Sequence, residues 1–113
     1  MKYKKLDGRI TKTVLDVLEA LCADYPRRKR IIECRCRTRT SDAAVEDFRK
    51  TNQIIDCAME TVDMGLREYI LIDIGSGNGY ERSMASPFIS KDSYYLQKNR
   101  AIEAMARGFN MII

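Results

Sequence analysis

The sequence predicts an all-α protein that forms a single compact domain, with an N-terminal helical hairpin, a long central helix and a C-terminal helix-turn-helix. Three observations support this fold class. Apolar residues recur at spacings of three and four along most of the chain. Pro and Gly number only 2 and 6, so few positions interrupt a helix. The 113 residues suffice for one modest core, and the apolar content of 45% argues against disorder.

The N-terminal segment, residues 1–39, contains two predicted helices. Pro26 ends the first helix and can open a second, short one, because an early helical position needs no backbone donor. The polar residues from Arg37 to Ser41 predict a linker to the remaining part, residues 40–113. The apolar residues of the first helix, between Thr11 and Asp24, follow helical spacing: Val14, Leu15, Leu18, Leu21 and Cys22.

A basic cluster occupies the second helix and the linker, where Glu33 is the only acidic residue. Such a concentration of positive charge suits a polyanion, and the net charge of the chain is +4. We expect the cluster to contact flanking DNA backbone or a protein such as RNA polymerase. The alternative is a solvated basic helix face. The members of the basic cluster are Arg27, Arg28, Lys29, Arg30, Arg35, Arg37 and Arg39.

The long central helix is predicted from a heptad stripe that begins after an N-cap at Ser41 or Asp42. Such a stripe needs a partner helix, which is either an N-terminal helix of the same chain or a second copy in a homodimer. Asn52 interrupts the stripe, and Gly65 weakens the case for one continuous helix. The stripe consists of Phe48, Ile55, Val62 and Tyr69, with Met59 and Leu66 between them.

The C-terminal part predicts a helix-turn-helix over residues 80–109. Ser90 is a suitable N-cap for a helix that Gly108 ends. A shorter segment, Tyr80–Ala85, precedes it, and Pro87 disfavours a helical residue before it and so predicts the turn. A short helix, a tight turn and a longer helix form this motif. The alternative is an ordinary amphipathic helix.

The two faces of this last helix differ in composition. One face is apolar, with Tyr94, Ala101, Ile102, Met105 and Phe109, and is expected to pack. The other carries side chains of the kind that contact duplex DNA. Tyr95, Leu96 and Asn99 are predicted to lie against base edges, whereas Lys91, Ser93 and Arg100, with Arg82 from the preceding helix, are predicted to contact phosphates.

Residues Ser90–Tyr95, followed by Ala101–Ala106, resemble the recognition helix of ArpU/RinA-like phage transcriptional regulators. In that family the helix-turn-helix is similar to region 4 of sigma-70 factors. The resemblance implies a regulator of phage gene transcription, and we expect an activator. The chain departs from the family pattern at Ser83 and Pro87, where apolar residues are usual, and at Phe88, where the turn usually has a small or polar residue.

The stretch Tyr69–Tyr80 resembles, taken alone, the glycine-rich loop of S-adenosylmethionine-dependent methyltransferases. That fold needs several strands after the loop, and residues 81–113 are patterned as helix. The alternative interpretation, which we favour, is that the glycines end a helix. The chain has no His, P-loop or Gly-x-Ser-x-Gly motif, so we expect neither an enzyme nor a cofactor.

Two further function classes remain open, a helical adaptor for another protein and a phage packaging protein similar to small terminase subunits. Cys34-x-Cys36 is the only close pair of cysteines, so no metal site is expected. No apolar stretch follows the basic residues Met1–Lys5, and none approaches the roughly 20 residues of a membrane span. We therefore expect a cytoplasmic protein with reduced cysteines and no membrane partner.

Overall fold

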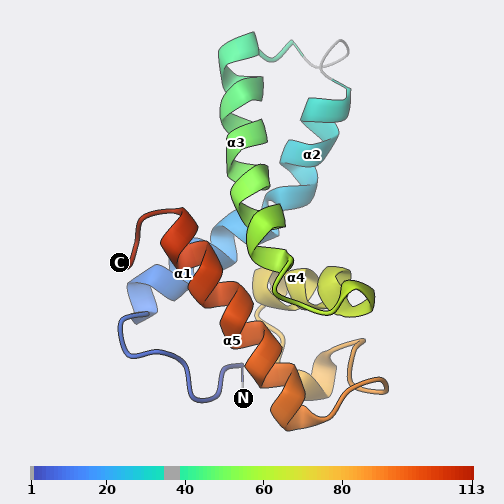
Figure 1. Cartoon of the computed structure of the whole chain (residues 1–113). Helices are drawn as coiled ribbons and strands as arrows, with labels where there is room; N and C mark the ends of the chain where they lie inside the picture. The colour runs from blue at the N-terminus through green and yellow to red at the C-terminus, as the bar shows by residue number, and fades with distance from the viewer. Residues whose placement is uncertain (1, 35–38) are drawn as a thin grey trace.

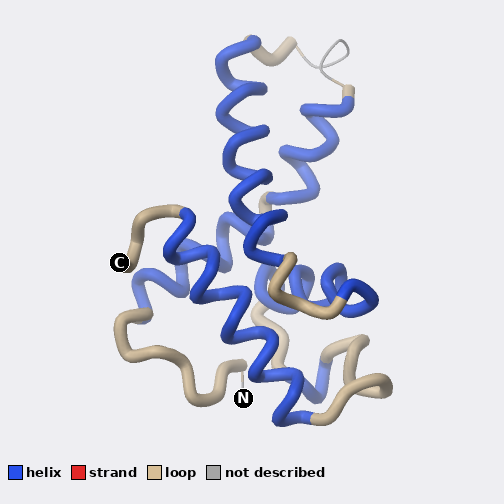
Figure 2. The backbone as a smooth tube through the Cα atoms, viewed as in Figure 1, coloured by secondary structure: helices blue, strands red, loops and turns tan. Residues whose placement is uncertain are grey.

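The computed structural model describes residues 2–34 and 39–113, and the regular structure in these ranges is entirely helical (Figure 2). The prediction of an all-α fold is confirmed. Within these ranges, five α-helices and two short 3-10 helices follow one another (Figure 1): α1 (Lys12–Ala23), α2 (Tyr25–Glu33), α3 (Asp42–Met59), η2 (Met64–Leu66), α4 (Arg67–Ser76), η3 (Tyr80–Arg82) and α5 (Lys91–Gly108). No helix in the described ranges is long and apolar enough to cross a membrane.

The hairpin of the N-terminal half differs from the predicted one. Helix α2 turns away from α1 at Asp24 and packs along α3, with which it forms an arm that projects from the other helices (Figure 1). A buried polar contact holds this arm together, because the Arg28 Nε atom donates to Asn52 Oδ1 at 2.8 Å. This contact accounts for the polar residue Asn52 within the apolar stripe, because its side chain pairs with Arg28.

The prediction of one long central helix is wrong. Helix α3 ends at Met59, and the chain turns before α4 begins at Arg67. The Thr61 hydroxyl donates to the Ala58 carbonyl at 2.8 Å, and the Gln97 side chain accepts from the Asp63 N–H at 2.8 Å, so the turn is fixed from both sides. The heptad spacing predicted which residues are buried. It did not predict that the segment carrying them is divided between two helices, α3 and α4.

Both halves of the heptad stripe enter the same core. Ile55 and Met59 from α3, Val62 from the turn and Leu66 before α4 are all buried within the chain. These side chains are not available to a second copy, so the stripe gives no support to a homodimer through the central helix. Its partners are α1, α4 and α5, which pack around it.

Two glycines determine how α4 sits in the fold. At Gly75 a Cβ atom would lie 2.8 Å from the Ala23 backbone nitrogen, so α1 and α4 approach each other closely there. Gly77 ends α4 with a φ of +70°, which only glycine adopts without strain. Residues Arg67–Ser76 are helical, so the strand of a methyltransferase-like loop is absent from this segment.

The prediction of a first helix in the helix-turn-helix is also wrong. Residues Tyr80–Arg82 form a single 3-10 turn, and irregular turns follow up to α5. The Tyr80 hydroxyl lies 3.0 Å from the Ser86 carbonyl and 2.8 Å from the Ile89 carbonyl, and so fixes this loop in a non-helical form. The second helix is confirmed as α5, and the Ser90 hydroxyl accepts from the Ser93 N–H at its start.

Candidate functional site

Five of the residues predicted to contact DNA are exposed to solvent, four on helix α5 and Arg82 on η3. Arg82, Lys91, Ser93, Leu96 and Arg100 are all exposed, and the side chain of Leu96 retains 52% of its surface. Arg107 continues the same side of the helix seven residues after Arg100, a spacing of about two helical turns. In Figure 1, α5 lies on the near side of the molecule, and no other helix covers it there.

The two remaining residues of the predicted base-contacting face, Tyr95 and Asn99, are buried, with 2% and 8% of their surface exposed. The Tyr95 hydroxyl accepts from the Tyr80 N–H at 3.2 Å. The Asn99 amide donates to the Lys4 carbonyl at 2.6 Å. The prediction that these two side chains lie against base edges is therefore wrong for this fold. The loop after α4 covers Tyr95, and the N-terminal segment covers Asn99. Helical spacing in the sequence could not predict either contact, because both join distant parts of the chain.

Lys98 is a buried polar residue that the sequence analysis missed. Its ammonium group donates to the carbonyls of Lys2 at 2.7 Å and Asn78 at 2.8 Å and lies 4.6 Å from the centre of the Tyr3 ring. Burial lowers the pKa of Lys98 to about 8. The sequence did contain a signal, since Lys98 is four residues from both Tyr94 and Ile102, on the face expected to pack.

The N-terminal segment brings further positive charge beside α5. Lys4 pairs with Asp92 at 3.0 Å, and this contact, together with the nearby Lys5, holds the pKa of Asp92 below its usual value. Lys91 is paired in the same way with Glu81, at 3.1 Å. The ammonium groups of Lys4 and Lys91 are therefore already paired with carboxylates.

Other cations around α5 form no close ion pair with a described residue, although Lys5 and Arg107 lie near enough to Asp92 and Asp7 to lower the pKa of each carboxyl. In the described part of the chain, no carboxylate lies within 4 Å of the cations of Lys5, Arg82, Arg100 or Arg107. We call the solvent side of α5 together with these flanking cations the α5 surface. Its members are Lys5, Arg82, Ser93, Leu96, Arg100 and Arg107.

The basic cluster divides into structural and free residues. Arg28 is buried and bonded to Asn52, so its assignment to a polyanion-binding patch is wrong. Arg27 pairs with Asp24 through two contacts of 2.6 and 2.7 Å, which lower the pKa of Asp24. Lys29, Arg30 and Arg39 are exposed and have no carboxylate within 4 Å in the described ranges. The predicted members Arg35 and Arg37 lie outside the described residues.

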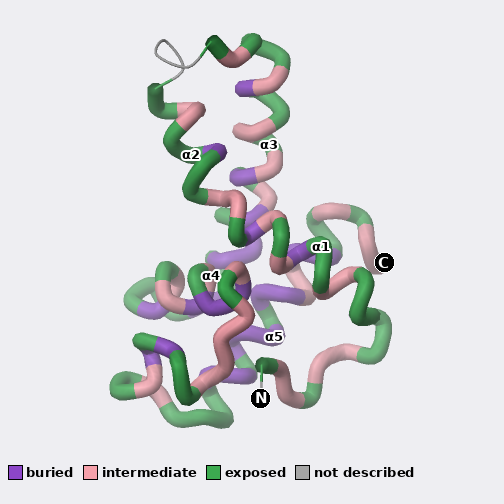
Figure 3. Tube along the Cα trace, turned by 180° about the vertical axis from the view of Figure 1, so that it is seen from behind, coloured by how far each residue is buried: buried purple, intermediate pink, exposed green. Residues whose placement is uncertain are grey.

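Helix α2, which carries Lys29 and Arg30, and helix α5 lie in different parts of the molecule (Figures 1 and 3). Helix α2 lies behind α3 in Figure 1, whereas α5 lies in front. The reversed view in Figure 3 brings α2 forward, with exposed residues on its near side.

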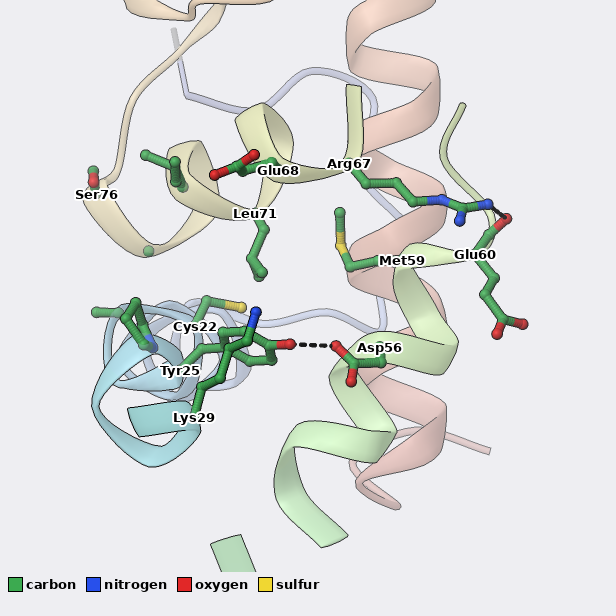
Figure 4. Close-up of a pocket in the computed structure, with 14 residues that line it drawn as sticks. Cys22, Tyr25, Lys29, Asp56, Met59, Glu60, Arg67, Glu68, Leu71 and Ser76 are labelled. Atoms are coloured by element: carbon green, nitrogen blue, oxygen red, sulfur yellow. Dashed lines mark hydrogen bonds between the residues drawn. The ribbon is translucent and has the colours of Figure 1, made fainter. Parts of the chain in front are cut away.

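A pocket of about 820 Å³ opens between the α1–α2 junction, the end of α3 and α4 (Figure 4). Met59, Leu71 and Ile72 supply much of its apolar wall, and Lys29 and Asp56 are among its charged residues. The sequence analysis did not predict this pocket, because its lining comes from segments up to about fifty residues apart in the chain. Among the described residues, no group of three Cys, Asp or Glu side chains is placed to hold a metal ion.

Comparison with known proteins identifies no relative of this chain. No protein-family model, no curated protein and no solved structure matches the chain.

Proposed function

We propose that this chain binds duplex DNA with the α5 surface, mainly through contacts to phosphates. The observation that carries the proposal is the set of four exposed cations, on or beside one helix, that form no ion pair within 4 Å in the described part of the chain. Unpaired Lys and Arg side chains gain most from phosphate contact, because binding releases the counterions that the duplex holds. Ser93 is placed to donate a further hydrogen bond, and Leu96 offers an apolar contact between the polar groups.

The proposal differs from a standard helix-turn-helix interface. With Tyr95 and Asn99 buried, the α5 surface offers few groups that distinguish one base from another. Contacts to phosphates give affinity and position but little sequence preference. We therefore expect moderate, salt-sensitive binding to many duplexes.

The biological role that we propose is regulation of transcription, in a phage or prophage setting. This rests on the resemblance of Ser90–Ala106 to the recognition helix of ArpU/RinA-like regulators. Arg30 and Arg39 are exposed and lie outside the α5 surface, so they would remain free for a second partner, for which that family suggests RNA polymerase.

The test is a fluorescence-anisotropy titration of a labelled duplex at several salt concentrations. The double variant Arg100→Ala/Arg107→Ala should weaken binding and flatten the slope of log affinity against log salt by about two units, roughly 0.9 for each lost phosphate contact. Lys12→Ala is the matched control, because Lys12 is exposed on α1 and already paired with Asp16 at 2.9 Å. Equal affinity and slope for the double variant and the wild type would contradict the assignment of the α5 surface.

A second candidate is a helical adaptor that binds another protein. The loop before α5 exposes Met84 and Phe88, with 66% and 71% of their surface accessible, and Phe88 stacks on Tyr69 at 6.5 Å between ring centres. Exposed large apolar side chains are typical of protein contact sites. Absence of duplex binding even at low salt would favour this candidate over DNA binding.

A further inference from the structure

The pocket between the α1–α2 junction, the end of α3 and α4 has no part in the proposed DNA contact, because no residue of α5 lines it. Its volume of about 820 Å³ falls in the range of small-molecule sites, roughly 300–1,000 Å³. Three structural segments enclose it, as Figure 4 shows, with α4 on one side and the start of α2 on the other. Such a space suits a compact ligand better than a long partner helix.

The apolar part of the lining is concentrated on α3 and α4. Leu71 projects from α4 towards the start of α2, and Met59 from α3 lies beside it (Figure 4). Ile72 is half exposed at the same pocket, and Pro26 on α2 also lines it. A ligand with an alkyl body would cover these side chains and remove them from water.

Three polar side chains of the lining, those of Tyr25, Asp56 and Arg67, already form hydrogen bonds. The Tyr25 hydroxyl donates to Asp56 Oδ1 at 2.6 Å. The Arg67 guanidinium donates to the backbone carbonyl of Val62 at 2.9 Å and to that of Glu60 at 3.3 Å. The Glu60 carboxylate points away from the pocket in Figure 4. These groups leave little polar capacity for a ligand.

Lys29 is the cation that the pocket leaves uncompensated. No carboxylate lies within 4 Å of its ammonium group in the described part of the chain. Figure 4 shows this side chain extending from α2 into the space below Leu71, which separates it from Glu68 on the opposite wall. An anionic group in that space would form charge-assisted hydrogen bonds with Lys29.

We propose that this pocket binds a small apolar carboxylate, with its alkyl body against Leu71, Met59 and Ile72 and its carboxylate paired with Lys29. A single ammonium suits one carboxylate, whereas a phosphate group would call for several converging donors. Binding involves no covalent step, and it does not depend on the proposed DNA contact.

The experiment compares octanoate with its uncharged counterpart octanol, both below their aggregation limits, by calorimetry and by amide shifts in a two-dimensional NMR spectrum. Octanoate should bind about tenfold more tightly than octanol, the factor expected for one charge-assisted contact. The largest amide shifts should fall on α4 and on the start of α2. Lys29→Gln should reduce octanoate to the affinity of octanol, and Lys50→Gln should not.

Lys50 is a matched control because it is exposed on α3, outside this pocket, and has no ion pair in the described ranges. Equal affinity of the two ligands, retention of the octanoate preference in Lys29→Gln, or shifts confined to another surface would overturn the proposal. These outcomes leave the anisotropy test of DNA binding untouched, so failure of one proposal is distinguishable from failure of the other.

Discussion

Lys98 is the described charged side chain that the fold buries most completely, with 0% of its surface exposed. Burial disfavours the ammonium form, and the two carbonyls that accept from it offset only part of that cost. Because its pKa falls from 10.5 in a free chain to about 8 in the fold, the unfolded chain holds more protons between these values. The contribution of Lys98 to stability should therefore increase as the pH rises through 8.

Urea unfolding of the wild type and of Lys98→Met at pH 7 and pH 9.5 tests this expectation. The free energy of unfolding of the wild type minus that of the variant should rise by about 1–2 kcal/mol between these pH values. Taking the difference removes the opposing effect of Cys22, whose pKa burial raises to about 12 in both proteins. A difference that does not change with pH would show that Lys98 titrates normally in the fold.

At the scale of the helices, the crossing of α1 and α4 depends on Gly75. A methyl group there would lie 2.8 Å from the backbone nitrogen and 3.0 Å from the Cα atom of Ala23, neither of which can move without shifting α1. Gly75→Ala should therefore lower the free energy of unfolding by about 1–3 kcal/mol, as overpacking typically does. The midpoint of a urea titration measures the loss.

Gly65→Ala is the matched control for this substitution. A Cβ atom at Gly65 meets nothing within 4 Å, and its φ is not in the left-handed region. Removing a glycine at such a site restricts the unfolded chain, so the control should be neutral or stabilised by up to about 1 kcal/mol. Equal destabilisation by both variants would mean that loss of glycine, not the helix crossing, determines the effect.

The helices themselves show what local sequence could predict. Helical spacing indicated α1, Pro26 indicated the start of α2, and spacing together with the Ser90 N-cap indicated α5, because these signals act within one or two turns. The break after Met59 was not predicted, since the stripe keeps its period across the turn and the Gln97–Asp63 contact that fixes the turn joins residues 34 positions apart. Gly75 and Gly77 were predicted to end a helix, and only Gly77 does so.

At the scale of the whole molecule, the N-terminal segment closes the fold over α5. The Lys98 ammonium and the Asn99 amide donate to the carbonyls of Lys2 and Lys4, and the Tyr3 hydroxyl donates to Glu19 on α1 at 2.6 Å. These contacts join residues that are 16 to 96 positions apart, so no periodic pattern could have revealed them. They explain why Asn99, which was predicted to lie against base edges, is buried.

Deletion of residues 2–9 tests how far the fold depends on this segment. The deletion removes hydrogen bonds at Lys98, Asn99 and Glu19, each worth about 1 kcal/mol, and uncovers buried polar groups. The free energy of unfolding should fall by roughly 2–4 kcal/mol. Hydrogen exchange should accelerate in α5 around Lys98 and Asn99 and much less in the α2–α3 arm, which the segment does not contact in Figure 1. Uniform acceleration in both regions would instead indicate that the arm and α5 unfold as one cooperative unit.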